Sequence, residues 1–331
     1  MKICVGLKSN QELTKYIKAG ATEFYCGVFD DDWVNRYGYL VGVNRRPFPS
    51  GNFSNFKQLK EAVEKAHYHG CKVFYTINEH QYSEQQIDLL SHHVESSIQC
   101  GVDAIIFSDP GLMYMFKDKC NVHVSTGGTI FNKSTIKFYR DELQAQRIIF
   151  PRELTINEIK SLTKDNQDTE FEVFMMNEGC INIDGFCNHL HGLIYCSEQG
   201  SSSEMINYST ACSLKYRITS INSKSSITKS KDVLEQRLHV AMRKRGDCGI
   251  CAIYFFKDMG ITSLKLVGRS TSEDKVEKDI KILKYAIEFA NECNSFEEYY
   301  HNLNKLSCQR DNGLRLHECY YPDILKERCY E

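Results

Sequence analysis

The feature that most constrains the fold is a regular alternation of short β-branched or aromatic runs with amphipathic stretches. Residues 2–6 are typical of a buried strand and residues 11–19 of a helix, and this change of period recurs along the chain. We expect strands at residues 2–6, 23–28, 72–77, 104–107, 122–125, 147–150, 171–176 and 263–267. We expect helices at 11–19, 56–69, 84–101, 111–118, 134–142 and 156–163, and a long last helix that Ser272 opens.

Eight strands that are nearly all joined through helices predict an α/β fold of the (β/α)8 TIM-barrel type. An open doubly wound sheet is the alternative, but no G-x-G-x-x-G segment follows the first strand. A chain of 331 residues is a normal length for one such barrel. We therefore predict a barrel over residues 1–294 and a polar, tyrosine-rich extension over 295–331.

One connection is far longer than the others. Residues 177–262 separate the seventh and eighth expected strands, whereas βα loops usually have about 2–6 residues. The middle of this stretch, residues 199–232, is rich in Ser, Thr, Asn and Lys, and its two ends carry most of the nearby cysteines. We predict a functional insertion between strands seven and eight.

Charge and hydropathy exclude some classes of protein. The formal net charge of -2 gives no overall attraction to nucleic acid or anionic lipid. No stretch approaches the roughly 18 apolar residues that a membrane helix needs, and the N-terminal apolar run is too short for a signal peptide. We expect a cytoplasmic protein that does not bind membranes. Its 15 cysteines are then better explained by metal binding, catalysis or packing than by disulfides.

Four cysteines have the spacing of a metal site. Cys180 and Cys187 lie just beyond the seventh strand, and Cys248 and Cys251 form a C-x-x-C motif. Two distant pairs, each closely spaced, suit a four-thiolate centre, either an iron–sulfur cluster or a structural zinc ion. Cys212 is a fifth candidate. The alternative, that some of these are ordinary core cysteines, stays open.

Polar residues follow most of the expected strands, where a barrel builds its active site. Arg152 and Arg269 could clamp a carboxylate of a substrate, and Glu153 or Glu178 could act as acid or base. The alternative to these catalytic roles is that the same side chains cap helices or pair with one another at the rim. Other residues at such positions are Asn78, Glu79, His80, Asp109, Ser125, Thr126 and Asn177, and the aromatic, arginine-containing loop 30–55 could be a lid.

Several segments, in order, resemble the U32 family, historically called collagenase-like peptidases. The resemblance covers the chain to about residue 295. It rests on the STGGT segment at 125–129, the PREL segment at 151–154 with the helix after it, the segment from Glu172 through Cys180 to Cys187, and the closing strand that runs from Gly260 to Arg269.

The resemblance implies a barrel and, as in some members, a 4Fe–4S cluster on four cysteines. Cys180, Cys187, Cys212 and Cys248 match the ligand positions, and Cys251 leaves one thiol in excess. Members of the family take part in oxygen-independent hydroxylation of ubiquinone precursors and of RNA bases, with prephenate implied as oxygen donor. Some members need a protein partner of the same family.

Three hypotheses follow for the function. The first is an iron–sulfur enzyme that modifies a small molecule, a peptide or an RNA base, with oxygen-independent hydroxylation as the expected reaction. The second is a U32-type peptidase acting on a peptide; Ser125 with a histidine is conceivable, but neither G-x-S-x-G nor H-E-x-x-H occurs. The third is a zinc or iron–sulfur assembly subunit.

Overall fold

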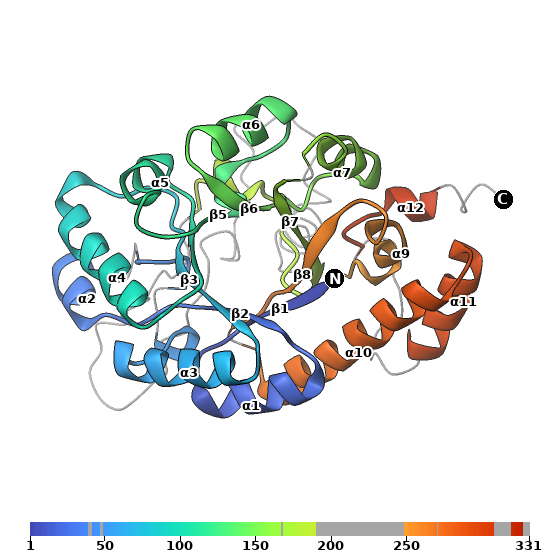
Figure 1. Cartoon of the computed structure of the whole chain (residues 1–331), viewed down its shortest axis with the longest axis horizontal. Helices are drawn as coiled ribbons and strands as arrows, with labels where there is room; N and C mark the ends of the chain where they lie inside the picture. Colours follow the sequence, from blue (N-terminus) through green and yellow to red (C-terminus); the bar gives the residue numbers. More distant parts are fainter. Residues whose placement is uncertain are drawn as a thin grey trace, which may run out of the picture.

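The computed structural model describes residues 1–38, 42–46, 49–166, 168–189, 248–269, 271–307 and 319–326. Eight parallel strands close into a barrel in which each strand pairs with its neighbours in the sequence, and β8 pairs with β1. Helices surround the strands, and the N-terminus lies near the centre of the view in Figure 1. The predicted (β/α)8 fold is confirmed.

The strands are short and joined mostly through helices. They are β1 (Lys2–Gly6), β2 (Glu23–Cys26), β3 (Lys72–Ile77), β4 (Ala104–Phe107), β5 (Val122–Val124), β6 (Ala145–Ile149), β7 (Glu170–Met176) and β8 (Ile261–Leu266). The described α-helices are α1 (Asn10–Ala19), α2 (Asp31–Tyr37), α3 (Phe56–Tyr68), α4 (Ile87–Gln99), α5 (Pro110–Phe116), α6 (Lys133–Asp141), α7 (Ile156–Thr163), α9 (Ile253–Phe256), α10 (Glu273–Glu292), α11 (Phe296–Ser307) and α12 (Asp323–Lys326). The described 3-10 helices are η1 (Pro49–Gly51), η2 (Glu84–Gln86), η3 (Thr126–Gly128), η4 (Asp184–Phe186) and η7 (Ile250–Ala252).

Most boundaries agree with the sequence-based prediction, and two differences have a clear cause. The second strand ends at Cys26 instead of Val28, because Val28 leaves the barrel ladder and forms an isolated bridge with Phe53. The prediction missed α2, a helix of seven residues that is too short to show an amphipathic period. Its N-cap is Asp30, whose side chain accepts a hydrogen bond from the Asp32 amide at 2.9 Å.

Charged side chains fill part of the barrel interior. Arg147 on β6 reaches Glu23 on β2, and its Nη1 also donates to Glu172 on β7 at 3.1 Å. Lys265 on β8 donates to the same Glu172 at 2.6 Å. Burial would lower the pKa of Arg147, but the carboxylates of Glu23 and Glu172 outweigh it and raise that pKa. The interior is therefore held by a network of paired charges as well as by apolar packing.

The chain after α10 packs back onto the barrel. Tyr299 on α11 is buried, and its hydroxyl donates to the Ile250 carbonyl at 2.7 Å. Tyr320 and Tyr321 are also buried members of the apolar core. The predicted extension thus contributes side chains to the same core as the barrel in the part that the structure describes.

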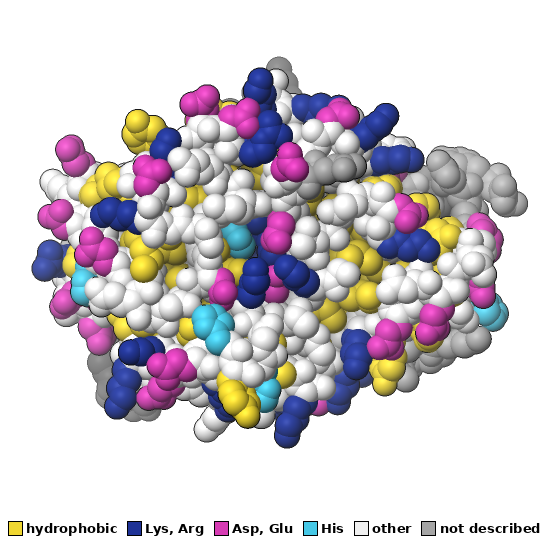
Figure 2. All heavy atoms as spheres, viewed as in Figure 1, with side chains coloured by type: hydrophobic (Ala, Val, Ile, Leu, Met, Phe, Trp, Pro, Cys, Tyr) yellow, Lys and Arg dark blue, Asp and Glu magenta, His cyan; other side chains and the backbone are white. Residues whose placement is uncertain are grey.

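On the face that Figure 2 shows, the basic and acidic side chains of the described residues are interspersed. Among the described helices, none has both the length and the apolar character needed to cross a membrane.

Candidate active site

A pocket opens where the strands end, and residues from several of the loops there line it. Its lining holds five basic and two acidic side chains, so the pocket carries an excess of positive charge. The lining residues are Tyr25, Arg45, Arg46, Thr76, Asn78, Ile106, Ser125, Thr126, Ile149, Arg152, Phe174, Glu178, Gly179, Cys180, Ile181, Asn182, Asp184, Lys265, Val267 and Arg269. Of the predicted catalytic residues, Arg152, Glu178 and Arg269 meet here.

Asp184 joins two sides of the pocket. Its carboxylate forms ion pairs with Arg45 at 2.9 Å and with Arg152. Burial would raise the pKa of Asp184, but the positive charges of Arg152 and Arg45 outweigh burial and hold that pKa well below its usual value. The Arg152 guanidinium also lies 4.0 Å from the centre of the Phe174 ring. Both arginines are thereby fixed in position at the pocket wall.

Close backbone packing fixes the turn that carries Asp184. Gly185 in η4 lies against η3, and a Cβ atom at this position would stand 2.5 Å from the Gly127 carbonyl oxygen and 2.1 Å from Thr129 Cγ2. Only glycine allows this approach without a shift of the backbone. The turn that carries the site is thus fixed by packing as well as by ion pairs.

Glu178 lies at the mouth of the pocket in an uncommon backbone conformation. Asn177 and Glu178 have φ values of 67° and 47°, in the left-handed region. The Asn177 side chain donates to Asp279 at 2.8 Å and accepts from Lys275 at 2.6 Å. The Glu178 carboxylate pairs with Arg46. Contacts to α10 therefore hold the turn that directs Glu178 into the pocket.

Arg269 is a buried guanidinium held by amides. It donates to Asn52 Oδ1 at 3.1 Å and to Asn44 Oδ1 at 2.8 Å, and among the described residues it forms no ion pair with a carboxylate. Gly27 leaves room for these amides, since a Cβ there would lie 2.4 Å from Asn44 Nδ2. Burial lowers the pKa of Arg269 to about 10, which leaves it charged at neutral pH. Its charge is available to an anion.

Lys265 forms the floor of the pocket. It lies 4.1 Å from the centre of the Tyr25 ring and is paired with Glu172 below it. Burial lowers the pKa of Lys265, but the Glu172 charge outweighs this effect and raises it, so the ammonium stays protonated. The floor is therefore connected to the buried charge network of the barrel.

Other predicted residues have different places. Glu153 is exposed and does not line the pocket. Asp109 caps α5 and accepts from the Gly111 amide at 2.7 Å. Ser125 lines the pocket, but in the described part of the chain its hydroxyl accepts from Asn78 Nδ2 at 3.5 Å and contacts no histidine. This arrangement gives no support to a serine nucleophile activated by histidine.

Three of the predicted metal-binding cysteines lie in the pocket wall, after η4 or at the end of β7. Cys180 lines the pocket, and its Sγ accepts from the Asn182 amide at 3.4 Å. Cys187 follows η4 and is partly buried. Cys248 forms an isolated bridge with Met176 at the end of β7.

Of the remaining two candidates, the structure describes only Cys251. Cys251 follows Cys248 in η7 and is buried. Cys212 lies outside the described residues.

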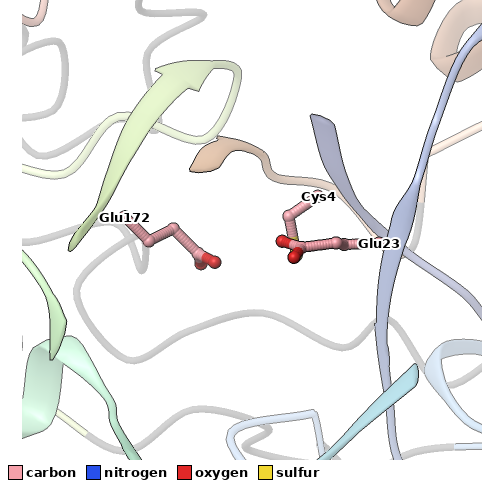
Figure 3. A group of neighbouring side chains, drawn as sticks. All are labelled: Cys4, Glu23 and Glu172. Atoms are coloured by element: carbon pink, nitrogen blue, oxygen red, sulfur yellow. The ribbon is translucent and has the colours of Figure 1, made fainter. Parts of the chain in front are cut away.

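Three side chains that could bind a metal ion lie close together inside the barrel. Figure 3 shows Glu172 pointing towards Cys4 and Glu23, and within the described chain the ligand atoms of these three residues lie within 4.8 Å of one another. Arg147 and Lys265 already neutralise the two carboxylates, and burial raises the pKa of Cys4 well above its usual value. The group is therefore part of the ion network and does not suit a cation.

Sequence reasoning missed part of the pocket. Lys265 and Asp184 were not predicted as site residues, and Arg45 and Arg46 were assigned only to a possible lid. A usable signal was present for Lys265, since a lysine within the apolar strand ITSLKL cannot face the packed helices without a partner. Asp184 had no such signal, because its partners come from distant loops.

Comparison with known proteins gives several relatives. A protein of Methanocaldococcus jannaschii described as an uncharacterized protease is 33% identical over 178 residues, which cover 52% of this chain and 39% of that protein. The tRNA hydroxylation protein P of Helicobacter pylori strain J99 is 24% identical over 263 residues, covering 78% of this chain and 58% of the relative. A 23S rRNA 5-hydroxycytidine synthase of Escherichia coli is 26% identical over 221 residues, covering 66% and 31%.

These relatives are longer than the part that matches, since the chain spans 39%, 58% and 31% of their lengths. The family model for peptidase family U32 matches residues 8–323, nearly the whole chain. The predicted resemblance is thus confirmed, and the chain belongs to the U32 family.

Proposed function

We propose that this chain is an iron–sulfur enzyme that hydroxylates a base of RNA without molecular oxygen, using a dicarboxylate such as prephenate as oxygen donor. The observation that carries the proposal is the positively charged pocket at the ends of the strands, with Cys180 in its wall. Two of the relatives are named as a tRNA hydroxylation protein and as a 23S rRNA 5-hydroxycytidine synthase. These names support RNA as the substrate.

The donor set fits an iron–sulfur cluster. Cysteine thiolates are the usual ligands of such clusters, and Cys180, Cys187, Cys248 and Cys251 all lie beyond β7 or in the chain that leads to β8. When bound, the cluster would supply the redox chemistry that no side chain in the pocket can supply. Cys212 remains a candidate ligand from the sequence.

Arg269 and Arg152 are suited to hold the carboxylates of the donor. The Arg269 charge has no carboxylate partner among the described residues, and the buried Nε of Arg152 has no hydrogen-bond acceptor there. A carboxylate placed between them would satisfy both groups with charge-assisted hydrogen bonds. This assigns the two arginines to binding and orientation of the donor.

Lys265 and Glu178 take the remaining positions around the reacting atoms. In the overall exchange the C–O bond of the donor breaks and its electron pair stays on the donor, which is reduced and takes up a proton while the base is oxidised. Protonated Lys265 at the floor would hydrogen-bond to the donor oxygen and hold it next to the base. Glu178 at the mouth, paired with Arg46, could accept the proton lost from the base. A base must leave its stack to enter such a pocket, so we expect an unpaired nucleotide as substrate.

The test is complementation in a bacterial host that lacks its own tRNA and rRNA hydroxylation proteins. Total tRNA and rRNA from this host are digested to nucleosides, and hydroxylated pyrimidines are measured by mass spectrometry. The wild-type chain should restore a hydroxylated nucleoside, Arg269→Gln should not, and Arg140→Gln should behave as wild type, because Arg140 is a surface residue paired with Asp141. A wild-type protein that contains iron and sulfide but yields no hydroxylated nucleoside would refute RNA hydroxylation.

A further inference from the structure

A third cysteine, which sequence reasoning did not connect with the site, lies beside the C-x-x-C motif. Cys319 forms a parallel backbone bridge with Cys248, and the amide of Tyr320 donates to the Cys248 carbonyl at 3.0 Å. The side chain of Cys319 lies next to that of Cys251. Two segments that are far apart in the sequence therefore bring three thiols together.

Contacts that do not involve sulfur hold the second segment in this place. The Tyr321 hydroxyl donates to the Phe174 carbonyl of β7 at 2.9 Å. Its ring packs on Gly249, where a Cβ atom would lie 2.7 Å from Tyr321 Cε2. The Tyr320 hydroxyl donates to the Asn177 carbonyl. The position of Cys319 thus follows from a docked segment.

We propose that Cys319 is a thiolate ligand of the same iron–sulfur centre as Cys248. The proposal rests on the proposed function, and it adds the C-terminal segment to the structure of the centre. Of the three thiols, Cys248 and Cys251 are buried and Cys319 is partly buried, so all three are shielded by the fold. The sequence segments that carry the family resemblance end at Arg269, and none of them assigns a role to Cys319.

The three thiols taken together do not have the spacing of a single-ion site. A tetrahedral zinc ion with Zn–S bonds of about 2.3 Å places its sulfurs roughly 3.8 Å apart. Among the described residues, Cys248, Cys251 and Cys319 do not form a group whose ligand atoms all lie within 4.8 Å. A cluster accepts wider spacing because each thiolate binds a different iron atom.

The first test leaves the wild-type chain intact. Protein purified without oxygen, and the same protein after iron removal by a chelator, are treated briefly with iodoacetamide, and each cysteine is quantified by mass spectrometry. Cys319 should be protected in the iron-loaded protein and become labelled after iron removal, whereas labelling of partly buried Cys120, in the turn between α5 and β5, should not change. Equal labelling of Cys319 in the two states would overturn the proposal.

The second test compares Cys319→Ser with Cys120→Ser by iron content, sulfide content and the electron paramagnetic resonance spectrum of the reduced protein. Cys319→Ser should lose most of its iron or change the spectrum, and Cys120→Ser should match wild type. The thermal unfolding midpoints of the two iron-free variants establish that both fold. Unchanged iron content and spectrum in Cys319→Ser would overturn the role of Cys319 alone, whereas wild-type protein without iron and sulfide would refute the proposed cluster itself.

Discussion

Glu23 and Arg147 bind each other across the barrel, from β2 to β6, through two hydrogen bonds of 2.6 and 2.8 Å. Both side chains are 1% exposed. Ser263 donates to the same carboxylate at 2.8 Å, so the Glu23 carboxylate has three hydrogen bonds inside the barrel. Burial would raise the pKa of Glu23, but the bonds and charge of Arg147 outweigh it and lower that pKa.

Replacing Arg147 should destabilise the protein strongly. Arg147→Met removes the buried cation that Glu23 and Glu172 share and leaves Glu172 with Lys265 and Glu23 with the partly exposed Lys2. Loss of one partner of a buried pair costs about 3–5 kcal/mol. Urea unfolding measures the free energy of unfolding. Arg140→Met is the control, because the Arg140–Asp141 pair is on the surface and only one further hydrogen bond, to Asn166, is lost, so the urea midpoint should fall much less. Equal midpoints for the two variants would contradict the assignment.

His80 should make the stability depend on pH. Burial, and then the positive charge of Arg45, lower the pKa of His80 from 6.5 to about 4. Between pH 6.5 and 4 the unfolded chain therefore binds a proton that the folded chain does not, and the free energy of unfolding falls as the pH falls.

Between pH 7 and pH 5 the free energy of unfolding should fall by about 1–3 kcal/mol less in His80→Asn than in the wild type, as unfolding experiments at pH 7, 6 and 5 would measure. The matched control is His92→Asn, because His92 is exposed on α4. If His80→Asn and the wild type follow the same curve, His80 does not titrate as described.

Gly185 should tolerate no side chain. In Gly185→Ala the new methyl group would meet a backbone carbonyl that cannot move aside freely, and overpacking of this kind costs about 1–3 kcal/mol. Gly111→Ala is the control, since the nearest atom there is one Asp109 carboxylate oxygen at 3.0 Å. The thermal unfolding midpoint should fall for Gly185→Ala only, and binding of a dicarboxylate, measured by calorimetry, should weaken with it.

Tyr321 should anchor the C-terminal segment through its hydroxyl group. Tyr321→Phe keeps the ring but leaves the Phe174 carbonyl without this donor, which costs about 1 kcal/mol. Tyr114→Phe is the control because Tyr114 is 66% exposed. Limited proteolysis should also cut the Tyr321→Phe variant near its C-terminus earlier than it cuts the wild type. Identical proteolysis and stability would show that the ring alone holds the segment.

The barrel could be predicted from the sequence because most of its strands and helices carry their own periodic pattern of apolar residues. The predictions for residues 2–6, 72–77 and 104–107 agree with β1, β3 and β4 to the residue. Short elements such as α2 were missed, because seven residues cannot establish a period of 3.6.

The site was only partly predictable. Arg152, Glu178 and Arg269 were found because they directly follow strands, and the ends of barrel strands converge. The place of Glu153 was not predictable, since a neighbour of a rim residue can point away from the pocket. Cys319 was not connected with the other cysteines, because local sequence contains no information on where a distant segment docks.

Lys265 belongs both to the pocket and to the ion network beneath it. A substitution at this floor residue leaves Glu172 with one cation fewer, whereas a change at the mouth, such as at Ile181, which is 45% exposed, leaves the interior intact. Mutational change of substrate preference should therefore occur mainly at the mouth of the pocket. Variants that alter the floor should persist only when a second substitution in the network rebalances its charge.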